Sequence, residues 1–90
     1  MQTAPVKPMK PWFQVIQDVG EHLNWQEFFG NDQPVELDIG CGRGLFLYNA
    51  TTSCPERNFL GLEVDYREGR RAAARLMKRQ QPNGRVIGGD

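Results

Sequence analysis

The sequence predicts an α/β protein built on a doubly wound, parallel β-sheet, and three observations support this prediction. From residue 34 onward, apolar strand-like segments alternate with helical ones in the order strand, helix, strand, helix, strand. The strands are apolar, which indicates parallel pairing through right-handed crossovers. A glycine-rich loop follows the first strand, and sheets of this kind bind ligands at the carboxyl ends of their strands. Functional residues are therefore expected directly after each strand.

Five elements are expected in this part of the chain, and prolines or glycines bound them. They are a strand at Pro34–Ile39, a helix at Leu45–Thr52, a strand at Asn58–Val64, a helix at residues 66–80 and a strand at Arg85–Ile87. The loop Gly40–Gly44 connects the first strand to the first helix.

The first 30 residues are expected to precede this domain, which spans residues 31–90. Residues 1–11 contain three prolines and are predicted to be a flexible arm. Residues 12–30 are predicted to be an amphipathic helical segment. The helical spacing is carried by Trp12, Ile16, Val19 and Leu23. Trp12 and Trp25 are expected to anchor the segment in the core.

A second, short helical turn is predicted at the end of this segment. Asn24 is suited to cap its start, with Glu27 three residues later, and Gly30 is suited to end it. Phe28 and Phe29 are expected to pack the turn against the rest of the protein.

Composition describes an ordinary soluble domain with 39% hydrophobic and 24% charged residues. There is no apolar run of the ~20 residues that a membrane span needs and no signal-peptide pattern, so a cytoplasmic location is expected. Cys41 and Cys54 match no zinc or redox spacing and His22 has no evident metal partner, so no metal is expected. Residues 67–90 carry seven basic and two acidic side chains, which hints at a polyanionic partner.

The glycine loop is the first candidate site. Gly40, Gly42 and Gly44 allow a sharp turn and a close approach to a ligand, although a plain tight turn would have the same composition. A dinucleotide-binding loop has the spacing G-x-G-x-x-G, whereas here the third glycine comes one residue early. Asp38, two residues before the loop, would repel a pyrophosphate and suits a cationic ligand such as the ammonium group of a methionine moiety.

Two further acids follow the next two strands. Glu63 comes 25 residues after Asp38, and its carboxylate could accept both ribose hydroxyls of an adenosine. Asp65 competes for that role, because it lies on the same side of the strand. Asp90, just beyond the third strand, could accept from the exocyclic amine of adenine. Each acid alone could equally be a solvated side chain, but three acids at three successive strand ends indicate a site.

These motifs resemble those of the tRNA (guanine-N7-)-methyltransferase family, whose members use S-adenosylmethionine. The resemblance runs from about Phe28 to Asp90 and is carried by three stretches. The first is Phe29-Gly30-Asn31 leading into Pro34–Gly44 and Phe46-Leu47. The others are Pro55-Glu56-Arg57-Asn58-Phe59-Leu60-Gly61-Leu62-Glu63-Val64 and Asn83-Gly84-Arg85-Val86-Ile87-Gly88-Gly89-Asp90. The middle stretch is the most specific to the family.

The resemblance implies a Rossmann-like sheet of the class I methyltransferase type, here truncated after the third strand. It implies that S-adenosylmethionine binds at Asp38, Glu63, Asp90 and the loop glycines, and that a methyl group moves to N7 of a guanine in the tRNA variable loop. The family's catalytic aspartate and tRNA-binding segments come after the position of Asp90. The 90 residues are therefore expected to be a fragment that is inactive by itself.

Several alternatives remain open at this stage. A methyltransferase for another acceptor would carry the same loop, and a half-domain could bind a partner chain at the unpaired edge of its first strand. A nicotinamide-dependent dehydrogenase is disfavoured by the early third glycine and by Asp38. Cys41 could be a nucleophile but suits a small filler residue. The helix at 66–80 carries a basic stripe that could contact tRNA phosphates or face solvent; it consists of Arg67, Arg71, Arg75 and Arg79.

Overall fold

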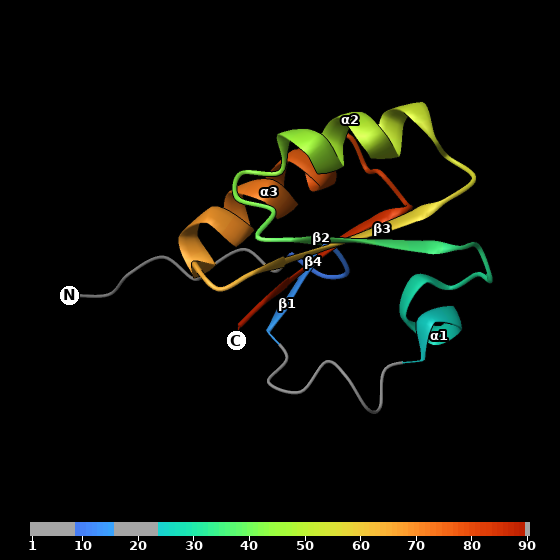
Figure 1. Ribbon diagram of the computed structural model, residues 1–90, viewed down its shortest axis with the longest axis horizontal. Helices are drawn as coiled ribbons and strands as arrows, with labels where there is room; N and C mark the ends of the chain where they lie inside the picture. Colours follow the sequence, from blue (N-terminus) through green and yellow to red (C-terminus); the bar gives the residue numbers. More distant parts are fainter. Residues whose placement is uncertain (1–8, 16–23, 90) are drawn as a thin grey trace.

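The computed structural model describes residues 9–15 and 24–89 and has the predicted α/β architecture. Its four strands form one parallel sheet (Figure 1). The strands are β1 (Phe13–Val15), β2 (Val35–Ile39), β3 (Asn58–Glu63) and β4 (Gly84–Gly88). The helices are α1 (Trp25–Phe29), α2 (Leu45–Ser53) and α3 (Tyr66–Lys78).

The strand order is β1-β4-β3-β2. The register places Leu37 beside Leu60 and Leu62 beside Ile87, so these side chains share one face of the sheet. All strands point the same way, so the ends of β2, β3 and β4 meet at one edge. Among the described residues β2 pairs only with β3, so it is the edge strand of the sheet next to the candidate site.

Helices α2 and α3 cover one face of the sheet and close the main core (Figure 1). α3 turns its small and apolar residues to the sheet, and α2 contributes Leu47. The fully or almost fully buried members of this core are Leu47, Phe59, Ala72, Ala73, Leu76 and Val86. Asn83 ties the loop after α2 to this layer, because its Nδ2 donates to the carbonyls of Thr51, Cys54 and Arg57 at 3.0–3.1 Å.

The short helix α1 lies on the opposite face and covers only the end at which the strands begin. Its predicted caps are confirmed: the Asn24 side chain accepts from the amide of Glu27, and Gly30 ends the helix with φ of 79°. Phe29 packs on Leu60 and Ile87. Helices therefore lie on both faces of the sheet, as a doubly wound fold requires.

Two polar side chains of the sheet, from Arg85 and Asn58, contact α1 and the segment that follows it. The guanidinium of Arg85 lies 5.2 Å from the centre of the Phe29 ring, and its burial lowers the pKa of the side chain. Asn58 Nδ2 donates to Asn31 Oδ1 at 2.7 Å, which links the segment after α1 to the start of β3.

Two expectations for the N-terminal part need correction. The helix predicted from Trp12 is wrong at residues 13–15, which form β1 and pair with β4, because the unpaired amides and carbonyls of β4 offer a sheet partner. The remainder of that helix, residues 16–23 with Ile16, Val19 and Leu23, lies outside the described residues, as does His22. Residues 9–11 of the predicted arm lead into β1, and Met9 packs against the core.

Both tryptophans pack as predicted. Trp12 lies against the main core and its Nε1 donates to the carbonyl of Gln81 at 3.0 Å. Trp25 packs on the cluster under α1 and contacts the rings of Phe28 and Phe29.

Candidate cofactor site

The glycine loop has the backbone shape that its sequence predicts. Gly40, Gly42 and Gly44 have φ values of 73°, 56° and 81°, a region that favours glycine. A Cβ on Gly44 would lie 2.6 Å from Ala72 Cβ, so this glycine is also needed for contact with α3. A Cβ on Gly40 would meet nothing within 4 Å, so the loop is open to solvent at that point.

Glu63 links the end of β3 to the glycine loop. Its Oε1 accepts from the amide of Gly42 at 2.7 Å, and its Oε2 accepts from the amide of Asp65 at 3.0 Å. A carboxylate has about four acceptor positions, so two remain for hydroxyl groups of a ligand while both bonds persist.

Asp65, the competing acid, has a structural task. It caps α3, and its Oδ1 accepts from the amides of Arg67 and Glu68 at 3.0 and 3.2 Å. Capping of this kind stabilises a helix by about 1 kcal/mol. The position of Asp65 at the start of the helix therefore favours Glu63 as the acid that faces the strand ends.

Asp38 precedes the loop on β2 and is half-buried, and this burial raises the pKa of its carboxyl group above the usual 3.8. Asp38 and Glu63 together produce a negative field at the loop. The pKa of the Cys41 thiol is raised to about 12. Burial of the thiol is the largest cause, and the negative charges of Asp38 and Glu63 add to it. A region of this sign attracts a cationic group.

The raised pKa and the packing of Cys41 both bear on its role. A nucleophilic cysteine needs a lowered pKa, whereas this thiol stays protonated at neutral pH. Its Sγ lies where a Cβ on Gly61 would be only 2.7 Å away, so the side chain fills the space above β3. The interpretation of Cys41 as a filler residue is supported.

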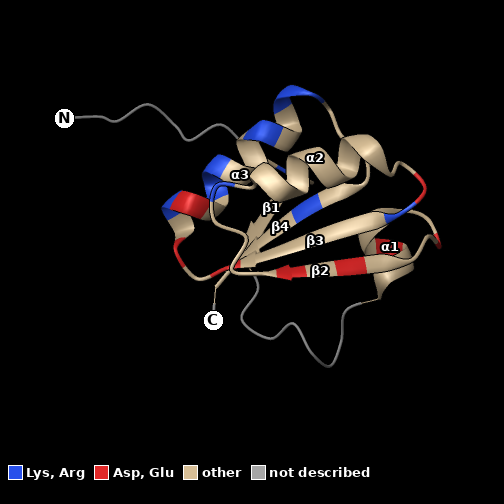
Figure 2. Ribbon diagram, turned by 45° about the horizontal axis from the view of Figure 1, so that its top comes forward, with Lys and Arg blue, Asp and Glu red and all other residues tan. Residues whose placement is uncertain are grey.

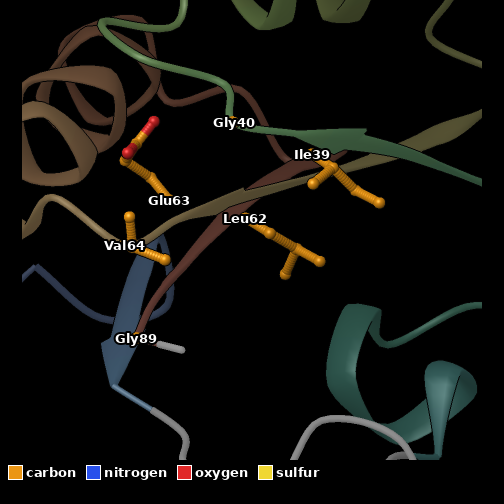
Figure 3. A pocket seen from close by; sticks show the side chains of 6 residues that line it. All are labelled: Ile39, Gly40, Leu62, Glu63, Val64 and Gly89. Carbon is orange, nitrogen blue, oxygen red and sulfur yellow. The ribbon is translucent and has the colours of Figure 1, made fainter.

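A cavity of about 330 Å³ opens at the carboxyl ends of β2, β3 and β4. It is lined by Ile39, Gly40, Leu62, Glu63, Val64 and Gly89. Figure 3 shows the side chains of Ile39 and Leu62 on one side of the strands and the Glu63 carboxylate on the other. A ligand that touches both must lie across the strand ends, where sheets of this type bind ligands. The volume is within the range of small-molecule sites, about 300–1,000 Å³.

The apolar walls of this cavity were not among the predicted site residues. Ile39 and Val64 are 78% and 66% exposed, unusual values for branched apolar side chains in or next to strands of a parallel sheet. The sequence could have indicated these two residues, because each directly follows a predicted site acid: Ile39 follows Asp38, and Val64 follows Glu63.

The four arginines of the basic stripe on α3 have different neighbours; Figure 2 shows the basic positions of this helix in blue. Arg71 Nη1 lies 3.4 Å from Glu68 Oε1, and Arg75 Nε donates to the carbonyl of Arg43 at 3.1 Å. Arg79 lies 5.8 Å from the centre of the Tyr48 ring on α2. Arg67 is exposed at the start of the helix. Within the described part of the chain, Arg71, Arg75 and Arg79 thus contact other groups of the protein.

Asp90, the third predicted acid, lies outside the described residues. Within residues 9–15 and 24–89 there is no cluster of three or more His, Cys, Asp or Glu side chains arranged to hold a metal ion. No helix in that part of the chain has the length and apolar character to cross a membrane.

Known proteins match the segment that carries this site. A family model described as "Putative methyltransferase" matches residues 32–90. A tRNA (guanine-N(7)-)-methyltransferase of Rhodopirellula baltica is 37% identical over 86 residues, which cover 96% of this chain and 32% of the relative. A tRNA (guanine-N(7)-)-methyltransferase of Bacillus cytotoxicus is 36% identical over 77 residues, which cover 84% of this chain and 36% of the relative. The chain therefore spans about a third of the length of these relatives.

Proposed function

Because the chain belongs to the methyltransferase family whose model matches residues 32–90, we propose that it forms the cofactor-binding part of a tRNA (guanine-N7-)-methyltransferase. The observation that carries the proposal is the single edge at which Asp38, the glycine loop and Glu63 converge beside an apolar cavity. The proposed cofactor is S-adenosylmethionine, the proposed substrate is tRNA, and the proposed setting is the cytoplasm.

The residues present fit this cofactor. The apolar side chains of Ile39, Leu62 and Val64 offer a wall for an adenine ring, and Glu63 retains acceptor positions for ribose hydroxyls. Asp38 and the negative field at the loop suit the α-ammonium group of the methionine moiety. Asp90 is proposed as the acceptor for the adenine amine, from its place after β4 in the sequence.

When bound, S-adenosylmethionine supplies an electrophilic methyl group on a sulfonium centre. The N7 atom of guanine already has a nucleophilic lone pair, so this chain is not required to provide a strong base. The task of its residues is to hold the methyl donor in one orientation, and alignment of this kind accounts for a large part of many enzymatic rate enhancements.

The acceptor is assigned on the names of the two relatives and on the motif between Pro55 and Glu63. A second candidate, a methyltransferase of the same family for another acceptor, would use the same edge of the sheet. The sequence motifs of this chain that resemble the tRNA enzymes favour the first candidate.

Calorimetric titration with S-adenosylmethionine, with NADH as the control ligand, tests the cofactor. We expect binding of the first ligand alone, because a negative field at the loop opposes a pyrophosphate. Binding of NADH alone would contradict the proposal. The natural protein that contains these residues would then be assayed for methyl transfer to unmodified tRNA, with the position of the new methyl group mapped on the RNA.

Glu63→Gln and Asp65→Asn separate the two competing acids. Glu63→Gln should weaken S-adenosylmethionine binding by about tenfold, the loss expected when a hydrogen bond to a charged acceptor is removed. Asp65→Asn should change it by less than about twofold, because asparagine caps a helix as well as aspartate does. Equal losses in the two variants would refute the assignment of the ribose contact to Glu63.

A further inference from the structure

The contacts behind the glycine loop come from α3, a helix with no assigned part in cofactor binding. Arg75 Nε donates to the carbonyl oxygen of Arg43 at 3.1 Å. In return, Arg43 Nε lies 3.5 Å from Glu68 Oε2. The same loop residue is therefore held at its backbone by one side chain of α3 and at its guanidinium by another.

The hydrogen bond from Arg75 acts on a specific peptide plane. The carbonyl of Arg43 and the amide of Gly44 belong to the same peptide group, which is planar and turns as a unit. The amide of Gly44 donates to the carbonyl of Cys41 at 3.0 Å. The carbonyl oxygen of this peptide thus accepts from Arg75 of α3, and its amide donates within the loop. The two bonds together restrict rotation of the peptide plane.

Packing restricts the same point of the loop. The Cα of Gly44 lies directly on α3, as the 2.6 Å approach of an added Cβ to Ala72 indicates. Gly44 is also the N-cap of α2, so its peptide determines the direction in which that helix starts. The loop between Gly42 and Gly44 has positive φ values at both ends, and glycines are free to leave this conformation when nothing holds them.

The front of the loop is held by a different residue. Glu63 accepts from the amide of Gly42, and this is the acid proposed to accept the ribose hydroxyls as well. A ligand that forms hydrogen bonds with Glu63 competes with the bond from this carboxylate to the loop. Arg75 and Glu68 contact the loop at a different residue, Arg43. They can keep the loop in place during ligand binding and release.

We propose that Arg75 and Glu68 are positioning residues, which hold the glycine loop in the conformation that receives the methyl donor. The inference rests on the proposed cofactor site and extends it to α3. It also gives Arg75, one of the four arginines of the basic stripe, a contact within the protein through its Nε.

The test compares two arginines of one helix in the full natural protein that contains this chain. Arg75→Met removes the donor to the loop and keeps the length of the side chain. Arg67→Met makes the same change of charge and volume on α3, where the arginine is exposed and its backbone amide keeps the bond to Asp65. Arg75→Lys restores a cationic donor and serves as the conservative variant.

Two quantities are measured in each variant. The first is the dissociation constant of S-adenosylhomocysteine by calorimetry, and the second is the hydrogen-exchange rate of the Gly44 amide without ligand. Arg75→Met should weaken binding by about three- to tenfold, as expected for one partly exposed, charge-assisted hydrogen bond, and should accelerate exchange at Gly44. Arg67→Met should match the wild type in both, and Arg75→Lys should recover part of the loss.

The outcomes distinguish this inference from the proposed function. If Arg75→Met and Arg67→Met give the same affinity and the same exchange rate, the positioning role is refuted and the cofactor site stands. If the wild type binds no S-adenosylhomocysteine while Arg75→Met still accelerates exchange at Gly44, the cofactor assignment fails and the hold of α3 on the loop is supported. A loss of affinity without faster exchange would refute the route through the loop.

Discussion

β4 and β2 are both five residues long and belong to the same parallel sheet, but their environments are opposite. Every residue of β4 is buried, since the strand lies between β1 and β3 and is covered on both faces. No residue of β2 is fully buried, and Leu37 is 54% exposed. The strand that leads into the candidate site is therefore the less protected of the two.

This contrast shows that position in the sheet decides burial more than composition does. Val35, Leu37 and Ile39 form an apolar row on the face opposite α2 and α3, and α1 reaches only Val35. Leu37 and Ile39 are 54% and 78% exposed, so the row is an apolar surface at the edge of the sheet.

The largest loss of stability is expected for a substitution in the buried core, and a matched substitution on the exposed strand β2 should cost much less. Leu76→Ala empties a fully buried site between α3 and the sheet and should lower the free energy of unfolding by about 2–5 kcal/mol. Leu37→Ala should lower it by less than about 1 kcal/mol, because the side chain is already half in water. Urea denaturation followed by circular dichroism measures both.

The two leucine variants can also contradict the difference in burial between β2 and the core. A cost for Leu37→Ala equal to that for Leu76→Ala would mean that the apolar row on β2 is covered in solution, for example by a second copy of the chain. Repeating the measurement at several protein concentrations would detect such an association, because its apparent stability rises with concentration.

Two glycines of the loop give the next largest effect. Gly44→Ala combines a positive φ with a Cβ that would lie 2.9 Å from Ala72 Cα, and it should cost about 2–4 kcal/mol. Gly40→Ala has the same kind of φ but open space around it, so it should cost only about 1–2 kcal/mol. Thermal unfolding of the two variants in parallel measures the difference, and a larger cost at Gly40 would contradict the packing of the loop on α3.

The smallest effect concerns the charge on β2. Burial raises the pKa of Asp38 above the ordinary 3.8, so folding favours its protonated form. The stability that this group contributes is present below the ordinary value and is lost as the pH rises through the raised one. Asp38→Asn should therefore be more stable than the wild type at pH 7, by less than about 0.5 kcal/mol, with no difference below pH 3.8.

Glu36 is the control for this prediction, because it lies on the same face of β2. Its Oε1 is 3.6 Å from Arg57 Nη1 in an exposed ion pair. Glu36→Gln should lower stability slightly at pH 7, by at most about 1 kcal/mol. Thermal unfolding measured from acid to neutral pH would contradict the role of burial at Asp38 if both variants shifted in the same direction.

Local signals in the sequence predicted most of the fold. Asn24, Glu27 and Gly30 predicted both ends of α1, and the boundaries of the later strands and helices agree with the structure to within about two residues. The α/β class and the resemblance to tRNA (guanine-N7-)-methyltransferases are confirmed by the parallel sheet and by the two relatives. The roles of Asp38, Gly40, Gly42, Gly44, Glu63 and Asp90 in cofactor binding stay predictions.

The features that were missed depend on contacts between distant parts of the chain. Residues 13–15 have an apolar pattern that also fits a helix, and only the free edge of β4 determines that they form a strand. The bond from Arg75 to the carbonyl of Arg43 joins residues 32 positions apart, and the sequence shows Arg75 only as one of a row of cations. The same spacing of arginines on α3 is compatible with a face exposed to solvent, with a contact to RNA, or with a hydrogen bond to a neighbouring loop.

The pairing of β1 with β4 has a consequence for folding during synthesis on the ribosome. Trp12, which leads into β1, donates to the carbonyl of Gln81, 69 residues later, and among residues 9–15 and 24–89 the strand partner of β1 is β4. Chains grow at about 5–20 residues per second, so this first strand waits roughly 4–14 seconds for the strand that completes it. During that interval the apolar side chains of β1 are available to chaperones and proteases, and neither the β1–β4 nor the β3–β4 ladder forms before β4 has been synthesised.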